Sequence, residues 1–456
     1  MGRLTESIVE FLTGEALASP PAQAVGVAVD GFTDCIGVMI AGSGEPVSRH
    51  LASYALARNG GGPSRLLLGP ERVHPSLAAL VGAGAAHALD YDDYAFGNHV
   101  SALLVPALIA EAERSGASGA ELLAAYLAGF EVWGEVYGRE PAHLHSRGWH
   151  PTGVFGALGV TAALCRLRGL DAAACRNALG LAATNGAGVM DNFGTEAKPY
   201  QGARAAEAGV VCVELALAGV DSGPHALDGT GGLLAALSPA DEVDRESPAD
   251  RLGHAWLAVR DGLNIKPHPT VGASQRCIDA AIQLHRDHRP AVEGIERVVA
   301  RVSEKHAAVM RFHRPRTASE ARFSLQFGVA AGLLTGRVGL AELSGDYLGR
   351  DDLQRLMARV EIEAGPDDDP EFPVGAAFDT VHVFLADGAR LDSEPVQRYL
   401  GHARNPMDES QLRAKFGQCV EPVIGPAAGQ GLFEALRDLP RLASVAELPT
   451  LPINPR

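Results

Sequence analysis

The stretch HALDYDDYAFGNHVSALLVPALIAEAE, residues 87–113, joins an acidic loop to a strongly apolar run. Apolar residues in its second half recur at three- and four-residue spacing, which predicts a helix packed in a protein core. The loop before that helix carries Asp90, Asp92, Asp93 and His99. Aspartates here would stabilise the helix start, or the loop would form one wall of an acid–base site. The stretch alone leaves both interpretations open.

The helical pattern extends through the first half of the chain. From about residue 5 to about residue 240, segments with the same apolar spacing follow one another, separated by glycine-rich breaks. Strands do not alternate with these helices and no GxGxxG motif follows a strand, which argues against a Rossmann fold. The 456 residues exceed the size of a single hydrophobic core. We therefore expect a mainly α protein whose first domain, residues 1–260, is large and all-helical.

The sequence pattern changes after about residue 290, where apolar and polar residues begin to alternate. The alternation predicts strands within residues 294–303, 357–365 and 378–393, and Asp387–Gly388 in the last stretch is a strong hairpin turn. Helical segments lie between these strands. Together they predict a smaller α+β domain, residues 261–405.

The remaining segment, residues 406–456, is helical again, and we expect it to pack back on the helical domain. Clefts between domains are common ligand sites. We therefore expect the functional site where the two domains meet.

Composition limits the partners of this chain. Its 39 basic and 55 acidic residues give a formal net charge of −16, which argues against nucleic acid and against an anionic membrane surface. The N-terminal segment is an acidic amphipathic helix rather than a signal peptide, and we expect no apolar run long enough to span a bilayer. The six cysteines lack CxxC spacing and are typical of reduced, buried thiols, so we expect a cytoplasmic protein.

Two further segments place titratable residues at predicted helix starts. In GWHPTGVFGALG, His150 precedes a helix, where an imidazole tends to stay neutral and can act as base or donor. In GVMDNFGTEAKPYQGARAAEAG, Lys198 precedes a proline and Arg204 follows in the next helix, an arrangement suited to an anion. A solvated surface lysine is the simpler alternative here.

A third segment, NIKPHPTVGASQR, holds Lys266, His268 and Arg276 where the two domains would join. These segments collect the few cations that an acidic protein needs to bind a carboxylate. A metal ion is not expected, because His143 and His145 are a conceivable pair of ligands but no third ligand has suitable spacing.

Six motifs follow one another along nearly the whole chain: HALDYDD with a histidine after it, GWHPTGVFGALG, GVMDNFGTEAKPYQGARAAEAGV, IKPHP, SEARFSLQF and NPMDESQLRAKF. By these motifs the chain resembles the MmgE/PrpD family, which contains 2-methylcitrate dehydratases, cis-aconitate decarboxylases and an iminodisuccinate epimerase. The resemblance implies a large all-helical domain with a smaller α+β lid, assembled as a homodimer. It also implies an active site between them that uses neither a metal ion nor an organic cofactor.

The resemblance further implies roles for single residues. Asp90 matches the first aspartate of the family's acidic motif, His99 the histidine that closes it, and His150 the histidine of GWHPT. Met190 and Lys198 match the methionine and lysine of the third motif. These positions line the pocket of the decarboxylase relatives.

Some positions depart from the family's pattern. Lys266 matches the lysine that opens the second domain's site loop, but the decarboxylases carry a histidine five residues later, where this chain has Val271, and His268 is offset from that position. Tyr94 stands where many relatives have threonine, and the gap from there to His99 is one residue shorter than in the decarboxylases. Their tyrosine upstream of an RP dipeptide is not evident. These departures argue against cis-aconitate decarboxylation.

We expect His99 and His150 to act as the acid–base pair, with Asp90 orienting one imidazole. Lys198 would take part in catalysis, and with Lys266 it would bind carboxylates and stabilise the negative charge that develops beside them.

Arg204 and Arg276 are the weaker candidates for carboxylate binding, while Tyr94, His268 and Met190 would contribute to substrate binding. The favoured function is a cofactor-independent lyase, most simply a hydro-lyase, on a small di- or tricarboxylic acid. The alternatives are an epimerase or isomerase acting on a related acid, and an inactive family member that binds carboxylates.

Overall fold

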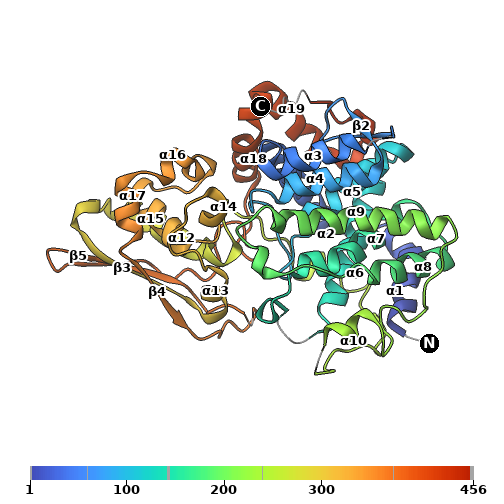
Figure 1. Ribbon diagram of the computed structural model, residues 1–456, viewed down its shortest axis with the longest axis horizontal. Coiled ribbons are helices and arrows are strands. Elements are labelled where there is room, and N and C mark those ends of the chain that lie inside the picture. Colours follow the sequence, from blue (N-terminus) through green and yellow to red (C-terminus); the bar gives the residue numbers. More distant parts are fainter. Residues whose placement is uncertain (1–2, 59, 141–143, 239, 373, 452–456) are drawn as a thin grey trace.

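The computed structural model describes residues 3–451 except 59, 141–143, 239 and 373. The chain forms two bodies that lie side by side (Figure 1). One hydrophobic core draws on residues 4–265 and 412–451, and a second core draws on residues 273–383. We call the first body the helical part, the second the α+β part, and residues 261–272 the connecting segment.

Long helices with small-residue surfaces make up the helical part. α7 packs against α6 and α9, while α4 packs against α9 and α5. Two short strands, β1 (Ser64–Arg65) and β2 (Arg72–Val73), pair antiparallel between α3 and α4. The helices of this part are α1 (Arg3–Thr13), α2 (Ala22–Gly42), α3 (Pro46–Ala57), α4 (Pro75–His87), α5 (Ser101–Ser115), α6 (Gly119–Tyr137), α7 (Pro151–Leu167), α8 (Ala172–Ala183), α9 (Ala197–Leu217), α10 (Leu233–Leu237), α11 (Leu257–Arg260), α18 (Glu409–Ile424) and α19 (Pro426–Arg437).

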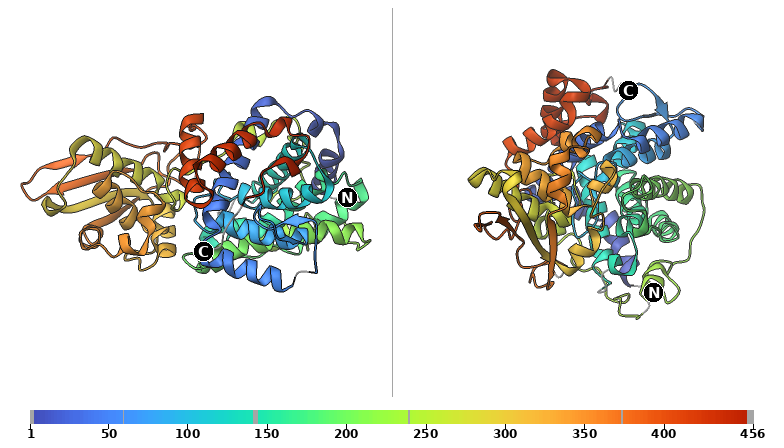
Figure 2. Two further views of the ribbon diagram at one scale, coloured as in Figure 1. Left: turned by 90° about the horizontal axis from the view of Figure 1, so that it is seen from above. Right: turned by 60° about the vertical axis from the view of Figure 1, so that its left-hand side comes forward.

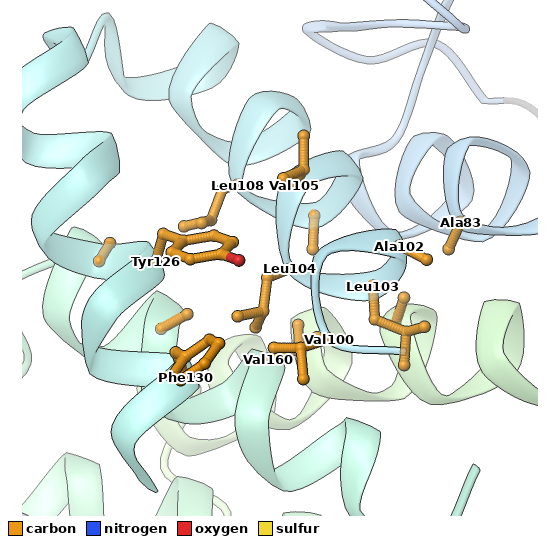
Figure 3. Close-up of a cluster of buried hydrophobic side chains, with 14 of the residues drawn as sticks. Ala83, Val100, Ala102, Leu103, Leu104, Val105, Leu108, Tyr126, Phe130 and Val160 are labelled. Carbon is orange, nitrogen blue, oxygen red and sulfur yellow. The ribbon is translucent and has the colours of Figure 1, made fainter. Parts of the chain in front are cut away.

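Glycines allow these helices to approach closely. A Cβ atom on Gly159 of α7 would lie only 2.4 Å from Cε3 of Trp133 on α6, and protein cores do not tolerate so short a contact without movement. Figure 3 shows the apolar cluster nearby, in which Tyr126 and Phe130 of α6 lie beside Leu104 of α5. The abundance of Gly and Ala in this half of the chain therefore serves tight helix packing.

The central helix α2 corrects one expectation from the sequence. By length and composition it could cross a membrane, whereas we expected no such run. Of its most apolar window, 72% is buried inside the protein. The apolar character of α2 is explained by its position in the core, since a helix that is apolar all round is either buried or membrane-spanning.

The C-terminal helices lie against the helical part, with α18 beside the junction of the two bodies (Figures 1 and 2). Both α18 and α19 contact α2. Lys415 of α18 reaches into the core, where its Nζ lies 2.5 Å from Asp34 Oδ1 and donates to the main-chain oxygen of Tyr91 at 2.9 Å. The last segment of the chain thus supports the acidic loop after α4 from behind.

The α+β part contains a four-stranded mixed sheet in the order β4-β3-β5-β6. β3 and β4 are parallel, while β5 is antiparallel to both β3 and β6. α12 and α15 pack against each other and against this sheet. The elements are α12 (Gln275–His288), β3 (Ile295–Ser303), α13 (Glu304–Val309), α14 (Ala318–Ala321), α15 (Leu325–Thr335), α16 (Gly345–Leu348), α17 (Asp351–Met357), β4 (Val360–Gly365), β5 (Thr380–Leu385) and β6 (Arg390–Asp392).

The alternation seen in the sequence marks these strands well. Each of the three alternating stretches contains a strand, and the third forms the β5–β6 hairpin. Gly388 in its turn has a φ of 86°, a conformation that favours glycine. The mainly helical fold and the small mixed sheet in the C-terminal region are therefore as expected.

A matched pair of glycine substitutions tests the packing of the helical part. Gly159→Ala should lower the free energy of unfolding by about 1–3 kcal/mol, because its methyl group would press on Trp133. Gly26→Ala lies on the exposed side of α2, where a Cβ meets nothing within 4 Å. It should be neutral or stabilise by up to about 1 kcal/mol through helix propensity. Urea unfolding followed by circular dichroism measures both, and equal stability of the two variants would contradict the packing described here.

Candidate active site

A pocket of about 740 Å³, partly open to solvent, lies between the helical part and the α+β part. The helical part supplies mainly polar side chains to its lining, together with the apolar ring of Phe193. The side chains from the α+β part are mostly apolar, and Lys305 and His306 of α13 are the polar exceptions. The titratable residues of the first group and of the connecting segment are Tyr94, His99, His145, His150, Lys198 and Lys266.

The loop between α4 and α5 places two imidazoles on one carboxylate. Asp92 Oδ2 accepts hydrogen bonds from Nδ1 of His87 at 3.0 Å and from Nδ1 of His99 at 2.7 Å. Both Nδ1 atoms therefore carry a proton, and Nε2 of His99 retains its lone pair. Asp92 and His87 are fully buried, whereas the His99 side chain is 14% exposed and lines the pocket. His99 is thus held in the tautomer that a general base requires.

Asp90, at the start of the same loop, binds two lysines. Its Oδ1 accepts hydrogen bonds from Lys198 Nζ at 2.8 Å and from Lys266 Nζ at 3.1 Å. Lys266 Nζ also donates to the main-chain oxygen of Asp90 at 2.7 Å. Burial alone would raise the pKa of Asp90, but the two ammonium groups outweigh it and hold this pKa well below its usual value. Two ammonium groups therefore lie beside the pocket on a single carboxylate oxygen.

His150 directly precedes α7, and Gln201 of α9 orients its ring. The main-chain N–H of Val189 donates to Gln201 Oε1 at 2.5 Å, so the amide Nε2 faces Nδ1 of His150 at 3.2 Å. Because that amide nitrogen can only donate, Nδ1 of His150 accepts and the ring proton sits on Nε2. Nε2 is buried without a hydrogen-bond partner among the described residues. His150 is thus held in the tautomer of a hydrogen-bond donor.

Burial keeps His99 and His150 neutral. It lowers the pKa of His99 to about 3, although Asp92 acts in the opposite direction. It also lowers the pKa of His150 well below its usual value, and the charge of Lys198 adds to this effect. Burial lowers the pKa of Lys198 as well, an effect that Asp90 partly offsets. The pocket therefore combines a neutral base and a neutral donor with ammonium groups.

The structure brings most of the expected catalytic residues together. Besides the two histidines and Asp90 with its lysines, Tyr94 lines the pocket, and its hydroxyl lies 2.9 Å from the hydroxyl of Tyr399. Lys266 Nζ lies 5.9 Å from the centre of the Tyr94 ring. Tyr94 therefore ties the acidic loop to the segment near residue 400 while facing the pocket.

Other residues expected in the site lie outside the pocket lining. His268 bonds through Nδ1 to the main-chain oxygen of Val338 and through Nε2 to Asp279. Arg276 donates to the main-chain oxygen of Ala376 at 2.7 Å and pairs with Asp369 at 3.5 Å. Both side chains therefore stabilise the α+β part.

Arg204 and Met190 also do not line the pocket. Arg204 donates to the main-chain oxygen of Asn185 at 2.9 Å and so holds the segment before α9. Met190 begins a 3-10 helix (Met190–Asn192), and its main-chain oxygen accepts a hydrogen bond from Arg311 of the α+β part at 2.5 Å. Arg204 and Met190 are close to Lys198 in the sequence, but their side chains do not line the pocket.

Three residues that support the histidines had no role assigned from sequence. Asp92 orients His99, whereas Asp90, which we expected to orient an imidazole, instead accepts hydrogen bonds from the two lysines. His87 ends α4 and reads as an ordinary core residue, and Gln201 is one polar side chain within a helix. Only the folded loop shows that they fix the two tautomers.

A metal ion at this site would compete with the hydrogen bonds just described. The potential ligand atoms of His87, Asp90, Asp92 and His99 lie within 4.8 Å of one another, which is close enough for a metal ion. However, Asp92 already accepts from both imidazoles, and Asp90 Oδ1 already binds two ammonium groups. The two ammonium groups on Asp90 already supply the positive charge that a metal ion would bring. His143, which with His145 formed the conceivable metal pair, lies outside the described residues.

Two family models match this chain. Residues 6–246 match the MmgE/PrpD N-terminal domain, and residues 268–439 match the MmgE/PrpD C-terminal domain. The chain is 30% identical over 398 residues to human cis-aconitate decarboxylase, which covers 83% of this chain and 80% of the human protein. It is 29% identical to the mouse enzyme, over 84% of this chain and 80% of that one. It is 27% identical to the cis-aconitate decarboxylase-like protein oryM of Aspergillus oryzae, over 98% and 96% respectively.

The order of the motifs, the helical and α+β parts and the two matched domains all lead to one conclusion. This chain belongs to the MmgE/PrpD family.

Proposed function

We propose that this protein is a cofactor-independent hydro-lyase that removes water from a small hydroxy acid carrying more than one carboxylate. The observation that carries the proposal is the pair of opposite tautomers in one pocket: Nε2 of His99 can accept a proton, and Nε2 of His150 can donate one. Elimination of water needs both abilities at once, because a C–H bond and a C–O bond break on neighbouring carbons.

The ammonium groups of Lys198 and Lys266 define where the substrate carboxylate binds. His99 takes the proton from the carbon next to that carboxylate, and the lysines stabilise the enolate-like charge that results. His150 then donates its Nε2 proton to the departing hydroxyl, so water leaves, a carbon–carbon double bond forms, and the imidazolate left on His150 is stabilised by the charge of Lys198. Solvent removes the proton from His99 and restores the one on His150, which closes the cycle.

Asp92 has two roles in this sequence. Before the reaction it fixes the tautomer of His99, and after proton transfer its charge stabilises the imidazolium. Burial would raise the pKa of Asp92, but the imidazole groups bonded to it hold this pKa well below its usual value, so it stays ionised.

Decarboxylation of an unsaturated tricarboxylate is the second candidate, and the names of the relatives support it. That reaction creates the carbanion by loss of CO2 and therefore needs a proton donor but no base. The Asp92–His99 pair, built as a base, favours elimination of water instead.

Proton NMR in D2O with a panel of di- and tricarboxylic acids, including 2-methylcitrate, citrate and cis-aconitate, tests the proposal. A new vinyl signal with loss of a hydroxy acid is the expected result. Release of CO2 from cis-aconitate would establish the second candidate in its place. Deuterium entering an α-carbon without any change of skeleton would show an epimerase.

Substitution of each histidine should separate the two halves of the reaction. His99→Asn should slow both α-proton exchange and dehydration, with kcat lower by about 10²–10⁴, because the base is lost. His150→Asn should keep exchange of the α-proton in D2O while dehydration falls by a similar factor, because only the donor is lost. Deuterium exchange and product formation are measured in the same NMR samples. His288→Asn, an exposed change at the end of α12, is the matched control, and loss of exchange in His150→Asn alone would reverse the assigned roles.

The pH profile should show no limb from histidine near neutrality. His99 must be unprotonated to act, and with its pKa lowered to about 3 it stays so above that pH. Lys198 must be protonated, and because burial lowers its pKa, kcat/KM should decline as pH rises through a value below that of a free lysine. Measurements of kcat/KM from about pH 5 to about pH 10 cover the usual pKa of histidine and the range expected for Lys198. An acid limb near the usual histidine pKa would contradict the buried, neutral base, and Lys198→Arg should move the alkaline limb upward.

A further inference from the structure

We infer that the natural substrate carries an alkyl chain in addition to two carboxylates, and this inference rests on the proposed function. The pocket is polar only where the histidines and lysines meet it. Much of the remaining lining consists of six apolar side chains of the connecting segment and the α+β part. We call them the apolar wall: Val271, Ala273, Val309, Phe323, Phe372 and Val374.

The apolar wall begins directly beside the cationic groups. Lys198 Nζ lies 5.2 Å from the ring centre of Phe323 and 5.2 Å from that of Phe193. The two rings lie 5.4 Å apart, and Phe193 also meets the ring of His150 edge-on at 5.1 Å. A substrate carboxylate at Lys198 therefore has aromatic surface as its immediate neighbour, where an apolar group is favoured and a second charge is not.

Several side chains of the apolar wall are incompletely buried. Val271, Val309, Phe372 and Val374 all retain some exposure to solvent. Covering such surface with an alkyl chain is favourable in proportion to the apolar area removed from water. The wall thus offers binding energy to an apolar group and none to a carboxylate.

The charges of the pocket limit the number of carboxylates. Asp90 and the ionised Asp92 together balance the charges of Lys198 and Lys266, so the polar end has no excess of positive charge. Lys305 of α13 adds a further ammonium group to the lining, and its Nζ lies 3.3 Å from Asp367. A compact acid with three carboxylates would place more negative charge here than these groups balance. Two carboxylates with an alkyl chain bring less negative charge into the pocket and also fit the wall.

Binding of non-reacting acids measures this preference separately from catalysis. The probes are 2-alkylsuccinates from methyl to pentyl, which carry no hydroxyl to lose, and propane-1,2,3-tricarboxylate, all measured by isothermal titration calorimetry on the full chain. Affinity should increase about threefold to fourfold for each added methylene until the wall is covered. A flat series, or tightest binding of the tricarboxylate, would overturn the inference.

Substitutions in the apolar wall test whether it causes the increase of affinity with chain length. Phe372→Ala should flatten the increase with chain length, and the nearly isosteric Val271→Thr should reduce it with less risk to the fold. Phe378→Ala removes the same side chain from an exposed position (48% exposed) outside the pocket lining, so it should bind like the unmodified protein. An unchanged series in both wall variants would overturn the assignment.

Turnover of 2-alkylmalates by NMR distinguishes this inference from the proposed function. If affinity increases with chain length but no malate loses water, the alkyl preference stands and the hydro-lyase proposal fails. If water is eliminated while affinity stays flat along the series, the hydro-lyase proposal stands and the alkyl preference is overturned.

Discussion

The buried carboxylate of Asp90 is the interaction on which the site depends. It holds Lys198 from the helical part and Lys266 from the connecting segment at one oxygen atom. Loss of one partner from such a buried group leaves uncompensated charge and typically costs about 3–5 kcal/mol. Asp90 also has a φ of 50°, a conformation unusual for a residue other than glycine, and its own main-chain oxygen accepts from Lys266. Charge balance and loop conformation are thus maintained by the same three residues.

This arrangement explains how two histidines stay neutral close to two lysines. Positive charge nearby disfavours protonation of either ring, and burial acts in the same direction. When His99 accepts a proton at Nε2, the new charge arises 3.6 Å from Asp90 Oδ1 while Nδ1 still donates to Asp92. The two aspartates are therefore placed to compensate the imidazolium only after it forms, which is the condition for catalysis rather than for tight binding of the ground state.

Local patterns in the sequence were sufficient for much of this architecture. Periodic apolar spacing marked the helices, alternation marked the strands at 295–303, 360–365 and 380–385, and motif order identified the family. The acidic loop also drew attention to Asp90 and His99 for a physical reason, because titratable groups rarely crowd against a core without partners.

Side-chain direction was the information that local patterns lacked. Lys266 and His268 are two residues apart, yet the lysine turns to Asp90 and the histidine to Asp279. Arg276 lies on the first turn of α12 and binds Asp369, which is 93 residues further along the chain. Gln201 fixes the tautomer of His150 only because α9 packs against α7. Such partners are set by packing between distant segments, so spacing along the chain does not reveal them.

The helical part and the α+β part supply different components of the site. The acid–base groups stand at helix ends of the helical part, whose close glycine contacts leave little room for change. The apolar wall belongs mainly to the α+β part, and Ala273 of the wall lies in the separate core of that part. Side chains of that wall can therefore change without disturbing the tautomers of His99 and His150, since neither histidine takes its hydrogen bonds from the α+β part. A family built in this way can keep one proton-transfer apparatus and adapt it to acids of different shape, which is consistent with several chemistries sharing one fold.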